Sequence, residues 1–304
     1  MTIDSMTSGS HPDTMSIGQL MVAAPSGGTN ALVLTTAGTN VPLSVWSYAT
    51  VSRGGSLQVL NGAVQIGYSL AVQGELSLAH ASSFLLVTND VFSRVNIQQG
   101  SFRQSAGTMI SRHLRITDWM SNEVMRASVF LSGGKQVILE RLEVGCGLVS
   151  NTGVLQITGG EMVTTNADAE FAAKIGVDGA GEVLLSGGMW RAGSIYLAAQ
   201  SNTAGSFLMT GGQLLAPQGD FIIGQYGQGR MTVSNGTWEA DNVKVGNARG
   251  IGQWGRNTAI GQGSLTVAGG SVRVAGDFNV GGHPQSLATR GRGEVRVKKA
   301  GFFI

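Results

Sequence analysis

The sequence predicts an all-β protein that folds as a parallel, right-handed β-solenoid of about ten coils. Composition gives the first indication, because glycine supplies 47 of the 304 residues, about twice its usual share of roughly 7%. Charged residues make up only 12%, about half of the roughly 25% that is usual. A chain of this kind favours many short strands joined by tight turns, and no helical pattern stands out.

An internal repeat gives the second indication. Each copy opens with glycine or another small residue, continues with alternating apolar residues and reaches a Gly-Gly or Asn-Gly turn. Copies start roughly 19 to 34 residues apart, which is typical of solenoids, propellers and arrays. The clearest copies are GVLQITGGEM from Gly153, GEVLLSGGMW from Gly181, GSFLMTGGQL from Gly205, GRMTVSNGTW from Gly229 and GSLTVAGGSV from Gly263; weaker ones open at Gly55, Gly74, Gly100, Ala127 and Gly293.

The apolar periodicity within each copy gives the third indication. The second and fourth residues after the opening glycine are apolar, as at Leu155 and Ile157, which is the pattern of a strand with one buried face. A further alternating pair, such as Val243 and Val245, closes the copy before another glycine. Three strands in about 24 residues predict one solenoid coil, and ten coils at about 4.8 Å would make a rod of about 48 Å.

An antiparallel array of hairpins is the alternative, because LTVAGGSVRV (265–274) also reads as a hairpin around a glycine turn. The third alternating segment favours the solenoid, since it would leave an odd strand in each hairpin unit. We expect residues 1–30 to form a flexible leader or strap and residues 31–304 to form a single solenoid domain. The larger insertions fall at one offset of the repeat, so residues 246–262 are predicted to protrude from one edge.

The pattern G-x-L-x-V-x-G-G-x-V followed by F-x-V-G resembles the β-strand repeats of autotransporter passenger domains. It also resembles repeat-rich surface proteins of environmental bacteria, including those with a PEP-type C-terminal sorting signal. The resemblance spans roughly residues 50–304 and implies secretion or surface display, a right-handed β-helix and adhesive or structural roles. The chain departs from these families because it shows no signal peptide, membrane barrel or sorting tail, which leaves the export route open.

Several classes of function find no support in the sequence. A formal net charge of +2 is too small to indicate a nucleic-acid partner, and no apolar run approaches the 18 or so residues that span a membrane. The single cysteine, Cys146, rules out an internal disulfide, and the four histidines lack metal-ligand spacing. We therefore expect no metal and no cofactor.

The long insertion supplies the predicted partner-binding residues. Trp254 lies there between Arg249 and Arg256, where an exposed indole could stack on a sugar ring or anchor a protein partner. Trp190 and Trp238 occupy one equivalent position of the repeat. That equivalence predicts two inward-facing core residues and not a sugar-binding platform.

No catalytic residues are predicted. The densest acidic region comprises Asp168, Glu170, Asp178 and Glu182, and paired carboxylates can act as general acid and base when they lie roughly 5 to 10 Å apart. These residues fall in spacers between strands, where charges keep the outer surface hydrated. We expect the protein not to be an enzyme.

The function predicted from these features is that of a non-enzymatic, extracellular structural or adhesive β-solenoid. The last repeat copy ends at Phe302, Phe303 and Ile304 without a polar cap, so these residues are expected to be an assembly end for end-to-end fibre formation. The expected partners are further copies of the chain and surface glycans. The alternatives are a polysaccharide-degrading enzyme on the same scaffold and a trimeric receptor-binding fibre of a phage or secretion system.

Overall fold

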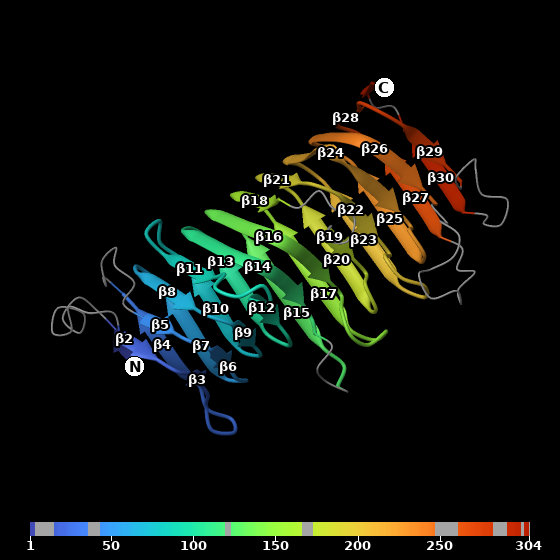
Figure 1. Cartoon of the computed structure of the whole chain (residues 1–304). Helices are drawn as coiled ribbons and strands as arrows, with labels where there is room; N and C mark the ends of the chain where they lie inside the picture. The colour runs from blue at the N-terminus through green and yellow to red at the C-terminus, as the bar shows by residue number, and fades with distance from the viewer. Residues whose placement is uncertain are drawn as a thin grey trace.

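The computed structural model describes residues 1–3, 15–35, 43–118, 123–165, 173–246, 261–281 and 291–298, together with the backbone of residues 301–303. In these residues all 31 regular elements are β-strands, and they pair in parallel with strands of the coils before and after. Figure 1 shows them stacked side by side from the blue N-terminal end to the red C-terminal end. The described part of the chain holds no helix that is long and apolar enough to cross a membrane.

Face 1 of the solenoid is a 12-stranded sheet that takes one strand from each coil. Its strands are β1 (Thr2–Ile3), β4 (Asn30–Leu34), β7 (Gly55–Val59), β10 (Glu75–Leu78), β13 (Ser101–Gln104), β15 (Arg126–Leu131), β17 (Thr152–Ile157), β20 (Ala180–Leu185), β23 (Ala204–Met209), β25 (Gln228–Val233), β27 (Gln262–Val267) and β30 (Arg292–Val297).

Face 2 follows face 1 in every coil. Its strands are β2 (Met15–Ile17), β5 (Leu43–Val45), β8 (Ala63–Ile66), β11 (Phe84–Val87), the first halves of β14 (Thr108–Ile116) and β16 (Lys135–Val144), β18 (Glu161–Thr164), β21 (Met189–Ala192), the first halves of β24 (Gln213–Ile223) and β26 (Thr237–Val245), β28 (Ser271–Val274) and β31 (Gly301–Phe303).

Face 3 completes the coil. Four long strands run from face 2 into face 3, so these two faces form one continuous 19-stranded sheet. The strands of face 3 are β3 (Leu20–Val22), β6 (Tyr48–Val51), β9 (Ser69–Val72), β12 (Arg94–Ile97), the second halves of β14, β16, β24 and β26, β19 (Ala173–Ile175), β22 (Ile195–Leu197) and β29 (Phe278–Val280).

The strand register confirms the predicted parallel solenoid and excludes the hairpin array. The opening glycines of the repeat stack directly on one another in face 1, in the order Gly153, Gly181, Gly205, Gly229, Gly263 and Gly293. Twelve strands in face 1 are also close to the predicted count of about ten coils. Residues at equivalent positions of the repeat are therefore neighbours in adjacent coils.

The stacked glycines mark the corner between face 3 and the next strand of face 1, which we call corner 3. A Cβ on Gly229 would lie 2.0 Å from the backbone nitrogen of Gly224, and one on Gly181 would lie 2.3 Å from that of Gly176. Two stretches of backbone thus touch here without room for a side chain. Glycine at this position is required by packing.

At the first residue of corner 3, directly after the face 3 strand, two residues other than glycine take the left-handed backbone conformation. Five described coils have glycine at this position, such as Gly145 with φ of 77°, whereas Thr117 has φ of 74° and Ala198 has φ of 53°. The Thr117 hydroxyl offsets the strain, because it accepts the Cys146 N–H at 2.7 Å and donates to the Cys146 carbonyl at 2.9 Å. Cys146 is fully buried, and this burial raises the pKa of its thiol well above the ordinary value.

The main core is an apolar cluster that extends from Val22 to Val274, and Tyr196, Ala199 and Ile222 form a small second cluster. Trp190 and Trp238 are fully buried in the main core, as predicted from their shared repeat position. Their rings form a chain with Phe207 and Phe221, with centroid separations of 5.8, 6.2 and 4.9 Å. Each coil therefore closes the hydrophobic core of its neighbours.

Two expectations about domain organisation concern segments that are only partly described. Within residues 1–30, β2 and β3 pair in parallel with β5 and β6, so they take part in the first coils. Residues 4–14 lie outside the described residues. In the predicted protrusion 246–262, only Gly246, Gly261 and Gln262 are described.

Candidate functional site

The predicted site residues fall mostly outside the described part of the chain. Trp254, Arg249, Arg256 and Ile304 are not among the described residues, and neither are Asp168 and Glu170 of the acidic region. Phe302 and Phe303 belong to β31, whose backbone pairs with β28 through Val272 and Arg273. A charged cluster lies elsewhere, at the corner between faces 2 and 3, which we call corner 2.

A β-bulge creates this cluster. Ser111 of β14 pairs with Ile138 of β16, but two residues later His113 pairs with Arg141, so β16 has one residue more than its neighbour. The extra length lies at corner 2 and brings Glu140 opposite the Arg112–His113 pair. The bulge therefore positions charged side chains from consecutive coils beside one another.

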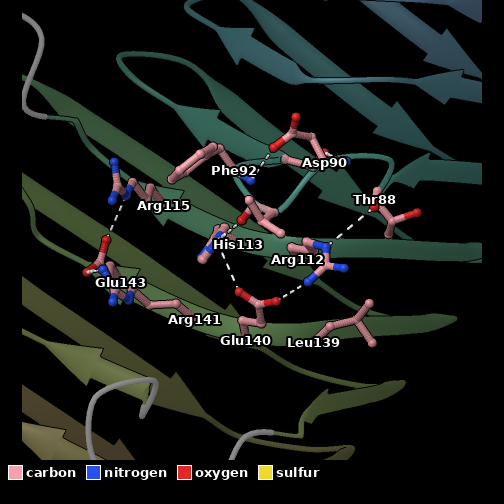
Figure 2. A network of polar contacts seen from close by, with 12 residues as sticks. Thr88, Asp90, Phe92, Arg112, His113, Arg115, Leu139, Glu140, Arg141 and Glu143 are labelled. Carbon is pink, nitrogen blue, oxygen red and sulfur yellow. Dashed lines mark hydrogen bonds and ion pairs between the residues drawn. The ribbon is translucent and has the colours of Figure 1, made fainter.

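Figure 2 shows the first half of the cluster, around Glu140. The carboxylate forms an ion pair with the Arg112 guanidinium and lies 3.4 Å from Nε2 of His113. The same His113 nitrogen lies 3.2 Å from the Val91 carbonyl oxygen, and Arg112 Nε donates to the Thr88 carbonyl at 3.4 Å. Arg112 and His113 thus connect β14 both to the coil before and to the coil after.

The second half of the cluster is built around Glu143, whose side chain is only 4% exposed. Arg115 Nε donates to Oε2 of this carboxylate at 2.7 Å, and Arg141 donates to Oε1 at 3.4 Å. Two guanidinium groups therefore compensate one buried negative charge. A buried carboxylate needs such partners, because desolvation of an unpaired charge costs several kcal/mol.

The loop from Thr88 to Ser93 lies over His113 and is fixed to the preceding coil. Ser93 Oγ donates to the Gly67 carbonyl at 2.9 Å and accepts the Asp90 N–H at 2.8 Å. The Asp90 carboxylate accepts the Phe92 N–H at 2.9 Å. This loop presents Phe92 to solvent, next to the arginines of the cluster (Figure 2).

The surroundings of His113 favour its neutral form. Burial lowers the pKa of His113 below its usual value, while the Val91 carbonyl and Glu140 act in the opposite direction and Arg141 and Arg115 reinforce the lowering. Its Nδ1 is buried and has no hydrogen-bond partner among the described residues. Protonation of this ring would add a buried positive charge beside several arginines.

The chemistry of the cluster is that of ion pairing. Glu140 and Glu143 are both engaged by arginines, so neither is poised to transfer protons. Ser111 is fully buried and the Ser93 hydroxyl is hydrogen-bonded to backbone, which leaves no activated hydroxyl beside His113. Within the described residues, this cluster fixes coils together and offers arginine side chains to the surface.

A shallow groove of 660 Å³ crosses face 1 at the start of β20, β23, β25, β27 and β30. Its acidic residues are Glu182 and Glu294, which belong to strands separated by three others. At about 4.8 Å per strand the two strands lie about 19 Å apart. That distance is too long for a pair of catalytic carboxylates, which typically lie about 5 to 10 Å apart.

Among the described carboxyl groups, Asp178 has the pKa that lies furthest from its ordinary value. It lies in the corner 3 loop, where burial raises its pKa to about 6 and Glu143 adds to this effect, while a hydrogen bond with the Gly147 backbone opposes it. Its Oδ2 is buried without a hydrogen-bond partner among the described residues. The perturbation arises from packing in the corner.

The sequence contains a signal for the charged cluster that the apolar repeat pattern does not reveal. The basic string RHLR (112–115) and the acidic-basic string ERLE (140–143) lie one coil apart at the same place in the repeat. Charges of opposite sign at equivalent positions of consecutive coils become cross-strand neighbours in a solenoid. The polar positions of consecutive copies therefore indicate this cluster.

No group of three or more histidine, cysteine or acidic side chains in the described part of the chain is arranged to hold a metal ion. Comparison with known proteins adds no assignment, since no family model, no curated protein and no solved structure matches the chain.

Proposed function

We propose that the protein is a non-enzymatic structural and adhesive rod of the extracellular surface, assembled from copies of this chain. The continuous apolar core is the observation that carries this proposal, because it runs through the stack from Val22 to Val274. A stack of this kind is stiff, since each coil depends on contacts with its neighbours. The extracellular location rests on the resemblance of the repeat to surface-exported proteins.

The use of charged residues supports a scaffold over a catalyst. Ion pairs connect consecutive coils, as in Lys135–Glu161 at 3.0 Å, Glu161–Arg191 at 3.3 Å and Asp220–Lys244 at 2.6 Å. These acidic and basic side chains are therefore engaged in ion pairs that hold consecutive coils in register. This arrangement stabilises a rod and leaves few free groups for acid–base chemistry.

End-to-end association would cover inward positions that are exposed in the last described coil. Val297 continues the core column of Val233 and Val267 but is 48% exposed, and Val280 continues that of Val245 but is 46% exposed. No described strand pairs with the far edge of β30 or β29. A second copy that added its own coil there would bury these side chains and satisfy the open strand edges.

Light scattering after size exclusion, followed by electron microscopy, tests this assembly. We expect filaments or a ladder of oligomers that grows with concentration, and a Val297→Asp variant that stays monomeric and keeps the circular dichroism spectrum of the wild type. A wild-type protein that stays monomeric at every concentration would contradict the assembly. A discrete trimer would favour the receptor-binding fibre instead.

The location has its own test. Surface proteolysis of intact cells that produce the full-length natural protein should remove it, while a cytoplasmic control protein stays intact. Protection of the protein until the cells are lysed would contradict surface display.

A polysaccharide-degrading enzyme is the competing function, and the raised pKa of Asp178 is the observation that favours it. A screen for glycan cleavage decides between the two. Activity that disappears in Asp178→Asn, Asp168→Asn or Glu170→Gln variants of intact fold would replace the structural proposal with the enzymatic one.

A further inference from the structure

The most exposed aromatic side chains of the described residues gather around one corner of the solenoid. Trp46, Tyr48 and Phe92 are 73%, 47% and 60% exposed, and all three lie at or next to corner 2. The Tyr68 ring packs edge-on against Tyr48 with a centroid separation of 4.9 Å. Exposed aromatic groups of this kind, gathered in one area, indicate an interaction surface.

Backbone hydrogen bonds show that these residues occupy consecutive coils. Tyr68 N donates to the Ser47 carbonyl at 3.0 Å, and Arg94 N donates to the Tyr68 carbonyl at 3.1 Å. Trp46, Tyr68 and Phe92 therefore follow one another along the rod, one ring for each coil step of about 4.8 Å. This step is close to the length of one sugar residue in an extended polysaccharide.

Face 3, which begins at this corner, carries an excess of positive charge. Its described strands direct five basic side chains outward and only two acidic ones, a surplus of three positive charges when His113 is neutral. The basic residues are Arg94, Arg115, Arg141, Lys174 and Lys244, and the acidic residues are Glu143 and Asp220.

Arg94 connects the aromatic and the cationic features. It is two residues from Phe92, pairs in register with Ser69 and His113, and forms no ion pair with a described residue. Its Nε is buried and also has no hydrogen-bond partner in the described part of the chain. The terminal Nη groups of a guanidinium can bind a carboxylate or sulfate group through two parallel hydrogen bonds.

We propose that corner 2 and the adjoining part of face 3 bind an extended acidic polysaccharide that runs along the rod. Sugar rings stack on Trp46 and Phe92, and Arg94 pairs with the carboxylate or sulfate groups of the same chain. This assignment rests on the proposed adhesive function and names its ligand class. The same surface of a second copy fits less well, because the surplus positive charges of the two copies would face one another.

Binding of fluorescent glycans to the full chain tests the proposal. Heparin supplies sulfate groups, polygalacturonate supplies carboxylates, and dextran is a neutral control; single-stranded DNA tests the other class of polymer that stacks on aromatic side chains. We expect binding to one or both acidic glycans, weakening with salt, no binding to dextran, and weaker binding to DNA.

Variants locate the site. Trp46→Ala with Phe92→Ala should weaken glycan binding about tenfold or more, and Arg94→Gln should weaken it severalfold with a smaller dependence on salt. Matched controls lie on face 1, where Phe130→Ala removes an aromatic ring that packs against Arg103 and Arg230→Gln removes an exposed arginine. These controls should bind like the wild type, and circular dichroism should show that all variants keep the β fold.

Three results would overturn the proposal: absence of binding to either acidic glycan, equal loss of binding in the face 1 controls, or tighter binding of single-stranded DNA. Failure of glycan binding is distinct from failure of the structural function, because filament formation is measured separately. A protein that forms filaments without binding acidic glycans would remain a structural rod with a different ligand or none.

Discussion

Corners 3 and 2 of the solenoid turn the chain by opposite means. At corner 3 the backbone of one strand end touches the backbone of the next strand start, and glycines such as Gly181 and Gly229 stack without side chains between them. At corner 2 near β14 and β16, an inserted residue bulges outward and Arg112, His113 and Glu140 connect the coils. The first corner fixes geometry, whereas the second has room for side chains that differ from coil to coil.

The largest effect is expected from breaking corner 3. A Gly229→Ala substitution would place a Cβ 2.0 Å from the Gly224 nitrogen, and because backbone atoms cannot move aside cheaply, we expect a loss of about 3 kcal/mol or more of unfolding free energy. Chemical denaturation measures the change. Gly18→Ala is the matched control, since nothing lies within 4 Å of the added atom there; an equal loss in both variants would contradict close backbone packing as the cause.

A smaller loss of stability is expected when the charged cluster at corner 2 is disrupted. Glu143→Gln leaves Arg115 and Arg141 partly buried without their carboxylate, and we expect a loss of about 2 kcal/mol. Glu294→Gln breaks an exposed pair with Arg296 instead and should leave the melting temperature nearly unchanged. A Glu143→Gln variant as stable as the wild type would show that this cluster contributes little to stability.

Thr117 and Ala198 are the two described residues other than glycine that take the left-handed conformation directly after a face 3 strand. Thr117→Gly removes backbone strain but also removes both hydrogen bonds to Cys146, so we expect a net loss of about 1 kcal/mol. Ala198→Gly removes strain and no hydrogen bond, and its stability should stay the same or rise by up to about 1 kcal/mol. Thermal melts of the two variants should therefore move in different directions; a common shift would mean that the Thr117 hydroxyl does not offset the strain.

The smallest effect is expected from the titration of Asp178. Its folded pKa of about 6 lies above the ordinary value of 3.8, so the folded state favours the protonated form and stability falls as pH rises from about 4 to above 6. Because the group is only half-buried, solvent screening reduces the effect to on the order of 1 kcal/mol. Asp178→Asn should flatten this part of the stability–pH curve and stabilise the protein at pH 7. An unchanged stability–pH curve would mean that another titratable group causes this pH dependence.

The apolar periodicity was sufficient to predict the strands, their parallel pairing and the stacking of the opening glycines. Each of these depends on local spacing that repeats, and Trp190 and Trp238 were placed in the core for the same reason. The Glu140 and Glu143 cluster was not predicted, because it needs both the offset between coils and the extra residue of the bulge. Trp254 lies in an insertion that does not follow the repeat, so the repeat pattern does not predict the position of its side chain.

The stacked glycine columns also bear on how the length of this protein can change. Because the coils from Gly153 to Gly293 stack their opening glycines in one register, these coils are interchangeable units along the axis, while a shift of one residue within a strand would turn its core side chains outward. Removing the segment from Gly205 to Gln228 joins Ala204 to Gly229, which takes the place of Gly205 beneath Gly181. The rod would then be one coil, or about 4.8 Å, shorter and otherwise complete. Its length can therefore be tuned in whole coils without a change in fold.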